Sequence, residues 1–184
     1  MNFKGARASK FRHVYGKPMR KEKCFQNLRI TRNAQDGNYC AVNQKFIAVV
    51  VEVGGGGSFV VLPLASSGRV DHNAWKVTGH AGPVIDVKWS PFDDNIICSA
   101  SEDCLVRVWV IPDSGLERDL QESVAKLAGH SRKVLSVAWH PTAENILASA
   151  GYDHLLIVWN LNTCQPVNII SCHTDTIFSM AFNR

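Results

Sequence analysis

Two segments of this 184-residue chain, fifty residues apart, repeat one pattern, and this repeat constrains the fold more than any other feature. The first copy begins at Gly79-His80 and ends at Trp109, and the second begins at Gly129-His130 and ends at Trp159. A third copy begins at Cys172-His173. Repeats that start with Gly-His and end with Trp are typical of β-propeller blades, each about 40–45 residues long with four strands. The repeat therefore predicts an all-β fold made of successive four-stranded sheets.

Each copy contains short alternating apolar runs separated by turn residues, which indicate half-buried antiparallel strands. Pro91 and Pro141 follow the first run of each copy, and the strand must end there because proline lacks the N–H that a strand ladder needs. The expected strands lie near 84–89, 95–100, 105–110 and 122–127, near 134–139, 145–150, 155–160 and 166–171, and near 177–182.

The same pattern divides the chain into five segments. We expect a basic amino-terminal arm at 1–32, a degenerate first blade at 33–78, full repeats at 79–128 and 129–171, and the start of a truncated repeat at 172–184. Propellers close into a ring with about 4–8 blades. About three blades plus one strand predict an incomplete propeller, and we expect the chain to be a fragment of a longer protein.

Four residue types recur at matching places in the two full copies. They are His80, Ser99, Asp103 and Trp109 in the first copy, and His130, Ser149, Asp153 and Trp159 in the second. Both copies closely resemble WD repeats, and this resemblance implies a hydrogen-bonded chain from the Trp indole N–H through Ser and His to Asp. A buried Asp or His is tolerated when its polar atoms are paired. We therefore interpret the two sets, called tetrads below, as structural.

Two alternative interpretations would make the protein an enzyme. Ser, His and Asp form nucleophilic triads, but here they recur at blade spacing with Trp, and no Gly-x-Ser-x-Gly elbow is present. The run 54–57 is Gly-rich, but no Gly-Lys-Ser or Gly-Lys-Thr follows it and strand-like segments flank it, so a hairpin connection is the better interpretation. We expect no enzymatic activity, no cofactor and no small-molecule substrate.

The six cysteines form no Cys-x-x-Cys pair, and the histidines fall at repeat positions instead of ligand spacing. We therefore expect no metal site. The amino terminus has no apolar signal-peptide core, and no stretch reaches the ~20 apolar residues of a membrane span. Reduced thiols in the cytosol are the expectation that follows.

Charge is distributed unevenly along the chain. Residues 1–32 contain ten of the twenty Lys and Arg residues against Glu22 alone, a net charge of +9, whereas the remainder carries −5. This asymmetry favours an acidic partner for the arm, which could be protein, nucleic acid or anionic lipid. A solvated segment without a partner is the alternative.

Several blocks outside the repeat narrow the family. They include Ser9-Lys10-Phe11-Arg12-His13, Cys24-Phe25-Gln26-Asn27-Leu28-Arg29-Ile30, Val61-Leu62-Pro63-Leu64 and Trp109-Val110-Ile111-Pro112. These blocks closely resemble the opening of coronins, and the resemblance spans nearly all of the chain. It implies a seven-bladed propeller that binds filamentous actin and acts in actin filament organisation and cell migration. The implied location is the cytoplasm, at the actin cytoskeleton and the cell cortex.

In coronins a coiled coil downstream of the propeller oligomerises the protein and engages the actin-nucleating complex. The resemblance therefore implies contacts with this complex, and with cofilin, only through downstream regions. No heptad run with apolar a and d positions is present in this chain, so we do not expect this segment to oligomerise.

The basic residue that aligns with the arginine implicated in coronin actin binding is Arg29. An arginine can make bidentate contacts with carboxylates of an acidic filament surface. Lys10, Arg12, Lys21 and Lys23 are the weaker actin-binding candidates. The alternative is a WD-repeat module whose arm binds nucleic acid or anionic lipid, but it leaves the Ser-Lys-Phe-Arg-His block unexplained, so nucleic-acid binding is not expected.

Overall fold

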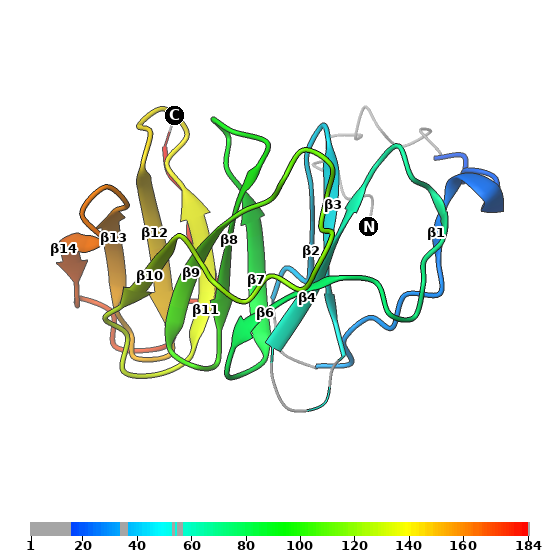
Figure 1. Cartoon of the computed structure of the whole chain (residues 1–184). Helices are drawn as coiled ribbons and strands as arrows, with labels where there is room; N and C mark the ends of the chain where they lie inside the picture. The colour runs from blue at the N-terminus through cyan, green and yellow to red at the C-terminus, as the bar shows by residue number, and fades with distance from the viewer. Residues whose placement is uncertain (1–15, 34–36, 53, 55–56, 184) are drawn as a thin grey trace, which may run out of the picture.

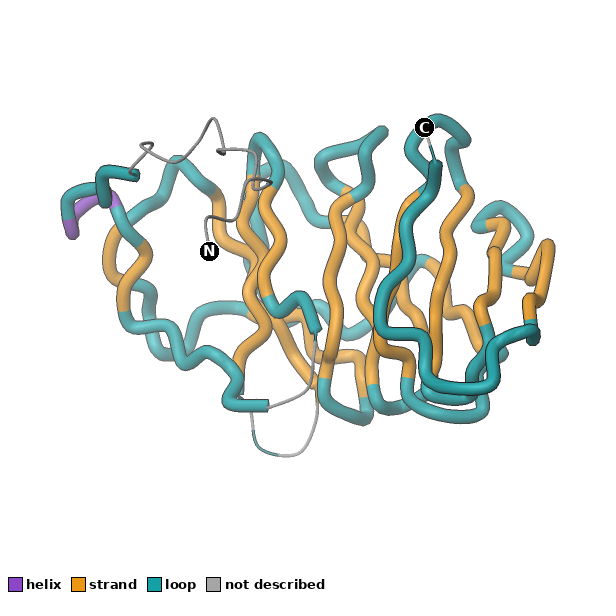
Figure 2. Tube along the Cα trace, turned by 180° about the vertical axis from the view of Figure 1, so that it is seen from behind, coloured by secondary structure: helices purple, strands orange, loops and turns teal. Residues whose placement is uncertain are grey.

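The computed structural model of the protein describes residues 16–33, 37–52, 54 and 57–183. These residues form three four-stranded antiparallel sheets and one two-stranded parallel sheet. The three larger sheets stand side by side in chain order, as Figure 1 and the reverse view in Figure 2 show. In the part of the chain that is described, no helix is long and apolar enough to cross a membrane.

Each larger sheet is built mainly from consecutive strands. The first sheet has the order β2 (Cys40–Val42), β3 (Phe46–Val51), β4 (Gly57–Pro63) and β6 (Lys76–His80). The second consists of β7 (Val84–Trp89), β8 (Ile96–Ser101), β9 (Leu105–Val110) and β10 (Ala125–Ala128). The third consists of β11 (Val134–Trp139), β12 (Ile146–Gly151), β13 (Leu156–Asn160) and β14 (Gln165–Ile170). β2, β7 and β11 each form one edge of their sheet and are called the inner strands below. β6, β10 and β14 form the opposite edges and are called the outer strands.

The eight strands expected within the two full copies all form. Those expected at 84–89, 105–110 and 134–139 have these bounds, and the others are displaced by a few residues at their ends. The strand expected at 177–182 does not form. A strand exists only with a ladder partner, and among the described residues this segment has none. Residues 178–180 instead line a cavity together with residues of β11, and Ile177 is buried.

The boundaries of the sequence repeat do not coincide with the boundaries of the sheets. Gly79-His80 opens the first copy but closes β6, the outermost strand of the first sheet. The following strands β7, β8 and β9 belong to the second sheet. In the same way His130 follows β10 of the second sheet and precedes the third. Each repeat therefore spans the junction between two sheets.

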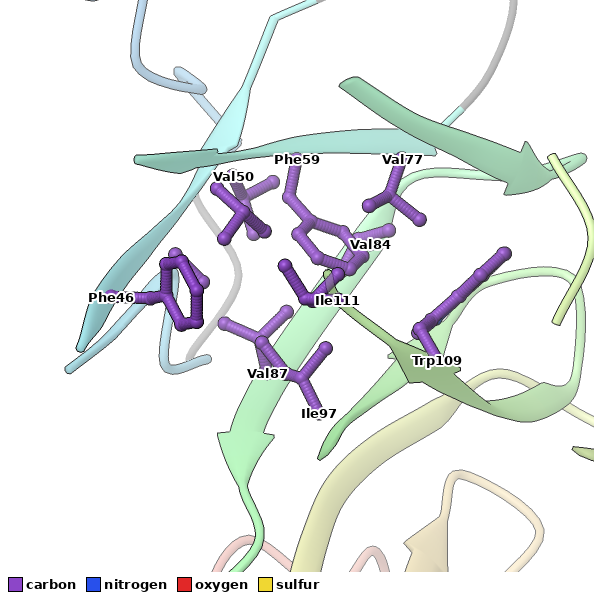
Figure 3. Close-up of a cluster of buried hydrophobic side chains, with 11 residues drawn as sticks. Phe46, Val50, Phe59, Val77, Val84, Val87, Ile97, Trp109 and Ile111 are labelled. Carbon is purple, nitrogen blue, oxygen red and sulfur yellow. The ribbon is translucent and has the colours of Figure 1, made fainter. Parts of the chain in front are cut away.

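Alternation along the strands builds one apolar core at each junction. Ile97 and Trp109 of the second sheet pack against the first sheet, whereas their chain neighbours Cys98 and Val108 pack against the third. Successive side chains of a strand point to opposite faces, so the second sheet is buried on both of its faces. Figure 3 shows side chains of the first sheet, including Phe46 and Phe59, gathered with side chains of the second, with Trp109 at one side of the group.

The glycine of each Gly-His pair is explained by close approach to a tryptophan. A Cβ atom on Gly79 would lie 2.5 Å from the indole of Trp109, and one on Gly129 would lie 2.7 Å from that of Trp159. Real Cβ atoms essentially never come this close to a heavy atom. The first and last residues of the repeat pattern therefore pack on one another.

Hydrogen bonds join the inner strands of neighbouring sheets. The Trp89 indole donates to the carbonyl oxygen of Ala41 at 3.1 Å, and the Trp139 indole donates to that of Lys88 at 3.0 Å. The buried carboxylate of Asp86 on β7 accepts the Val137 N–H of β11 at 3.0 Å. Burial raises the pKa of Asp86, although the Val137 N–H and the nearby Lys88 charge oppose this rise.

Candidate functional site

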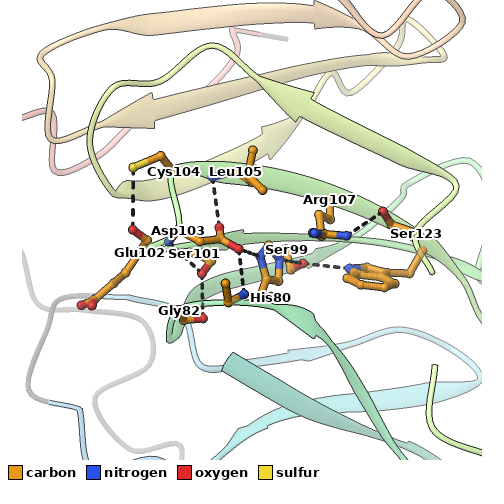
Figure 4. Close-up of polar contacts among 12 residues, drawn as sticks. His80, Gly82, Ser99, Ser101, Glu102, Asp103, Cys104, Leu105, Arg107 and Ser123 are labelled. Carbon is orange, nitrogen blue, oxygen red and sulfur yellow. Dashed lines mark hydrogen bonds and ion pairs between the residues drawn. The ribbon is translucent and has the colours of Figure 1, made fainter. Parts of the chain in front are cut away.

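The structure brings the four residues of the first tetrad into one hydrogen-bonded chain, most of which is visible in Figure 4. The Trp109 indole donates to Ser99 Oγ at 2.8 Å, Ser99 Oγ lies 2.7 Å from His80 Nε2, and His80 Nδ1 lies 2.9 Å from Asp103 Oδ2. The backbone N–H groups of Ala81 and Leu105 also donate to the Asp103 carboxylate. Every donor in the chain thus meets an acceptor.

The second tetrad has the same geometry. The Trp159 indole donates to Ser149 Oγ at 2.7 Å, Ser149 Oγ lies 2.7 Å from His130 Nε2, and His130 Nδ1 lies 3.0 Å from Asp153 Oδ1. His80 is the last residue of the outer strand of the first sheet, and His130 follows the outer strand of the second. The Ser, Asp and Trp of each tetrad belong to the next sheet, so each tetrad bonds two sheets together.

The carboxylates of the tetrads determine the direction of the hydrogen bonds. Burial alone would raise the pKa of Asp103, but the hydrogen bond from His80 and those from two backbone N–H groups hold this pKa below its usual value. The pKa of Asp153 is lowered in the same way against burial, by the Ser131 N–H and His130. An ionised Asp accepts from His Nδ1–H, which leaves Nε2 as the acceptor for the Ser hydroxyl.

Ser99 and Ser149 are fully buried, and each accepts a hydrogen bond from a tryptophan. A nucleophilic serine must reach a substrate. The Ser-His-Asp sets of the tetrads therefore offer no exposed nucleophile, and the functional site has to be sought on the surface.

The basic arm continues into a corner built by β1 (Phe25–Gln26), β5 (Gly68–Arg69) and the short 3-10 helix η1 (Lys21–Lys23), at the right of Figure 1. β1 and β5 pair in parallel. The Gln26 side chain donates to the Lys21 carbonyl oxygen at 2.6 Å, and the Asn27 side chain donates to that of Val70 at 3.1 Å. These bonds hold the corner against the chain that leads into β6.

Arg29 follows this corner, with its side chain on the outside. Its neighbour Leu28 packs on the apolar cluster of β3 and β4, and the Arg29 carbonyl oxygen accepts the Glu52 N–H at 3.0 Å. The Arg29 guanidinium lies 3.4 Å from His72 Nε2 and is exposed. Arg29 therefore presents a cation from an anchored backbone.

The described part of the basic segment is exposed throughout its charged positions. Residues 16–33 contain Lys17, Arg20, Lys21, Lys23, Arg29 and Arg32 against Glu22 alone, and all seven side chains belong to exposed residues. Lys21 and Lys23 lie on η1, in the same corner as Arg29. Lys10 and Arg12, the other two predicted contacts, lie outside the described residues.

A cavity of about 240 Å³ lies beside Arg29 and mixes charges of both signs. Its lining includes Arg29, His72 and Lys76 as well as Glu52 and Asp71. Arg32, on the same segment, pairs loosely with Glu52 at 3.9 Å. The arrangement brings Arg29 and His72 together on the surface, where the guanidinium can bind an anionic group of a macromolecular surface.

Comparison with known proteins identifies the family. The family described as a domain of unknown function (DUF1899) matches residues 4–69, and the WD domain, G-beta repeat, matches residues 72–110 and 121–160. Coronin-2B of Mus musculus is 60% identical over 177 residues, which cover 96% of this chain and 37% of that protein. Coronin-2A of Homo sapiens is 52% identical over 182 residues, covering 96% of this chain and 35% of that protein. The chain belongs to the coronin family.

The fold of this coronin chain agrees with that assignment. The WD40 domain of Toxoplasma gondii coronin superposes with a TM-score of 0.73 at 34% identity, covering 78% of this chain and 37% of that one. The expected WD-repeat propeller architecture is therefore confirmed, with three sheets in place of a closed ring. The chain spans somewhat over a third of the length of the coronins that it matches.

Sequence reasoning missed the contact between Arg29 and His72. The two residues are 43 positions apart, and His72 lies outside the repeat pattern. The contact arises from the parallel pairing of β1 with β5, two strands of two residues each that carry no periodic signal of their own. No pattern in this coronin sequence would have placed His72 beside Arg29.

Proposed function

We propose that this chain is an actin-filament-binding scaffold of the coronin type, without enzymatic activity, acting in actin filament organisation and cell migration. The observation that supports this proposal most is the exposed set of six cations at 17–32, among which Arg29 has an anchored backbone, in a chain of the coronin family. The proposed location is the cytoplasm, at the actin cytoskeleton and the cell cortex. Contacts with the actin-nucleating complex and cofilin are proposed only for the regions of the relatives that this chain does not span.

Arg29 is proposed as the principal contact. Its guanidinium can donate two parallel hydrogen bonds to one carboxylate, which a lysine cannot do. The carbonyl oxygen of Arg29 and the packed Leu28 side chain hold the residue in place, so less conformational entropy is lost on binding. Lys21 and Lys23 add positive potential from the same corner, which accelerates encounter with an acidic surface.

The test is co-sedimentation of the intact protein with actin filaments at fixed salt. Arg29→Asp replaces an attractive contact with a repulsive one, and we expect the dissociation constant to rise by about tenfold or more. Arg29→Lys keeps the charge but loses the planar fork, so we expect an intermediate loss. Thermal melts of each variant show that the fold is retained.

The matched control is Arg118→Asp, which reverses an exposed arginine on the connection from β9 to β10. We expect it to bind filaments like the unaltered protein. Equal losses of filament affinity for Arg118→Asp and Arg29→Asp would show that Arg29 contributes only through its charge and makes no specific contact. Binding of the unaltered protein to DNA or anionic vesicles, but not to filaments, would replace the proposal with the polyanion-binding alternative.

A further inference from the structure

The turn before β7 bonds to the turn after β8, and the turn before β11 bonds to the turn after β12 in the same way. The two pairs of turns occupy equivalent positions but have different side chains. In the second sheet the Glu102 N–H donates to the Pro83 carbonyl oxygen at 3.0 Å, and in the third sheet the Tyr152 N–H donates to the Lys133 carbonyl oxygen at 2.8 Å. The backbone requirement of the repeat is thus the same in both sheets. This backbone bond does not depend on which side chains stand at the two positions.

In the third sheet these positions form a basic and aromatic group, Arg132, Lys133 and Tyr152, here called the Lys133 patch. Lys133 Nζ lies 4.9 Å from the centre of the Tyr152 ring, within the range of a cation–π contact. Arg132 and Tyr152 are exposed. The equivalent residues of the second sheet are Gly82, Pro83 and Glu102, so the fold itself does not require the patch.

The acidic residues beside the patch do not neutralise it. The side chains of Asp103 and Asp153 are only 8% and 4% exposed, because their carboxylates point inward to His80 and His130. Arg132 and Lys133 therefore contribute positive charge at this edge of the third sheet without pairing to either of these carboxylates. The Tyr152 ring restricts the Lys133 side chain, so its ammonium group is held at a defined place.

The Lys133 patch lies on the same edge of the sheets as Arg32, which follows Arg29 on the basic segment. A cavity of about 470 Å³ is lined by Arg32 and Glu52 from the first sheet and its approach, and by Pro83 and Glu102 from the turns of the second. These turns are equivalent to the two turns that form the patch. Arg32 and the Lys133 patch therefore lie at the edge of the sheets where β7 and β11 begin, with the second sheet between them.

We propose that the Lys133 patch is a second contact with the actin filament, which binds a carboxylate-bearing surface on the other side of the second sheet from the site of Arg29. This inference rests on the proposed function. Two basic groups on one edge allow one rigid molecule to engage two acidic sites at once, and the second contact then forms at high effective concentration. Tyr152 contributes an apolar ring and a hydroxyl at the contact.

The test uses filament co-sedimentation of the intact protein carrying Lys133→Glu. We expect the dissociation constant to rise by about three- to tenfold, since the change reverses a charge at the interface. Lys126→Glu, on the exposed face of β10, is the matched control and is expected to bind like the unaltered protein. Tyr152→Leu keeps both cations but releases Lys133, and we expect a smaller loss of about two- to threefold.

Different results separate the two proposals. If Arg29→Asp weakens binding while Lys133→Glu and Arg132→Glu do not, the second contact is wrong and the proposed function stands. If the unaltered protein does not sediment with filaments, both proposals fail. Lys133→Arg provides the folded control with charge retained, and a loss there as large as that of Lys133→Glu would also overturn the inference.

Discussion

At the residue scale, the histidine of each tetrad uses both ring nitrogens to join two sheets. His130 bridges Ser149 and Asp153 across two sheets, and its side chain is buried. His130→Ala leaves the Ser hydroxyl and the Asp carboxylate without their partner. We expect the free energy of unfolding of the intact protein to fall by about 1–3 kcal/mol.

Chemical denaturation measures this loss, and filament binding by the fraction that remains folded is expected to be unchanged. Unaltered stability together with lost binding would contradict a structural role for His130. The surface substitution Lys126→Glu, which touches neither tetrad, provides the control for general effects of mutation.

The tetrads also predict how stability depends on pH. The pKa values of Asp103 and Asp153 are lower in the folded protein than the ordinary 3.8, so their contribution is complete above that value and is lost as pH falls through the lower folded pKa values. We expect acid unfolding to begin below about pH 4. Asp103→Asn is expected to flatten this dependence in denaturation curves taken between pH 5 and pH 2, and an unchanged slope would contradict the assignment.

At the scale of elements, the period of the apolar pattern was enough to predict all eight strands of the two full copies, because each has a partner within reach along the chain. The segment 177–182 has the same pattern without such a partner, and it forms no strand. The corner of β1 and β5 could not be predicted, since pairing between strands of two residues depends on tertiary anchors such as Asn27 and Gln26. Thus the repeat indicated the members of the tetrads and the resemblance to WD repeats implied their bonding, whereas neither indicated the surroundings of Arg29.

The hydrogen bond between Asp86 on β7 and Val137 on β11 predicts that stability depends on pH in the opposite direction to the tetrads. Burial raises the pKa of Asp86 in the folded protein. The stability that protonated Asp86 contributes is therefore present at low pH and is lost as pH rises through the raised pKa. Asp86→Asn keeps an oxygen to accept the Val137 N–H but removes the buried charge. We expect stability at pH 7 to be retained or increased, whereas Asp86→Ala should lose about 1–3 kcal/mol. Equal losses in the two variants, measured by denaturation, would show that the charge itself stabilises the junction.

At the scale of the whole molecule, the third sheet leaves apolar side chains in solvent. Val167 and Ile169 of β14 are 62% and 52% exposed, and Phe178 is 70% exposed. Blades are stabilised by the neighbours that cover their faces. We expect the 184-residue chain expressed alone to aggregate or pack loosely and to bind a dye that reports exposed apolar surface. A monodisperse monomer with a sharp melt would contradict this expectation.

The placement of each histidine one sheet ahead of its partners has a consequence for synthesis. When the ribosome has completed the first sheet, His80 at its edge still has no partner, because Asp103 is 23 residues further along the chain. The hydrogen bond between His80 and Asp103 can therefore form only after the following repeat emerges, and the same holds for His130 and Asp153. A pause in translation between the two members of a pair would leave an imidazole open to water and to chaperones.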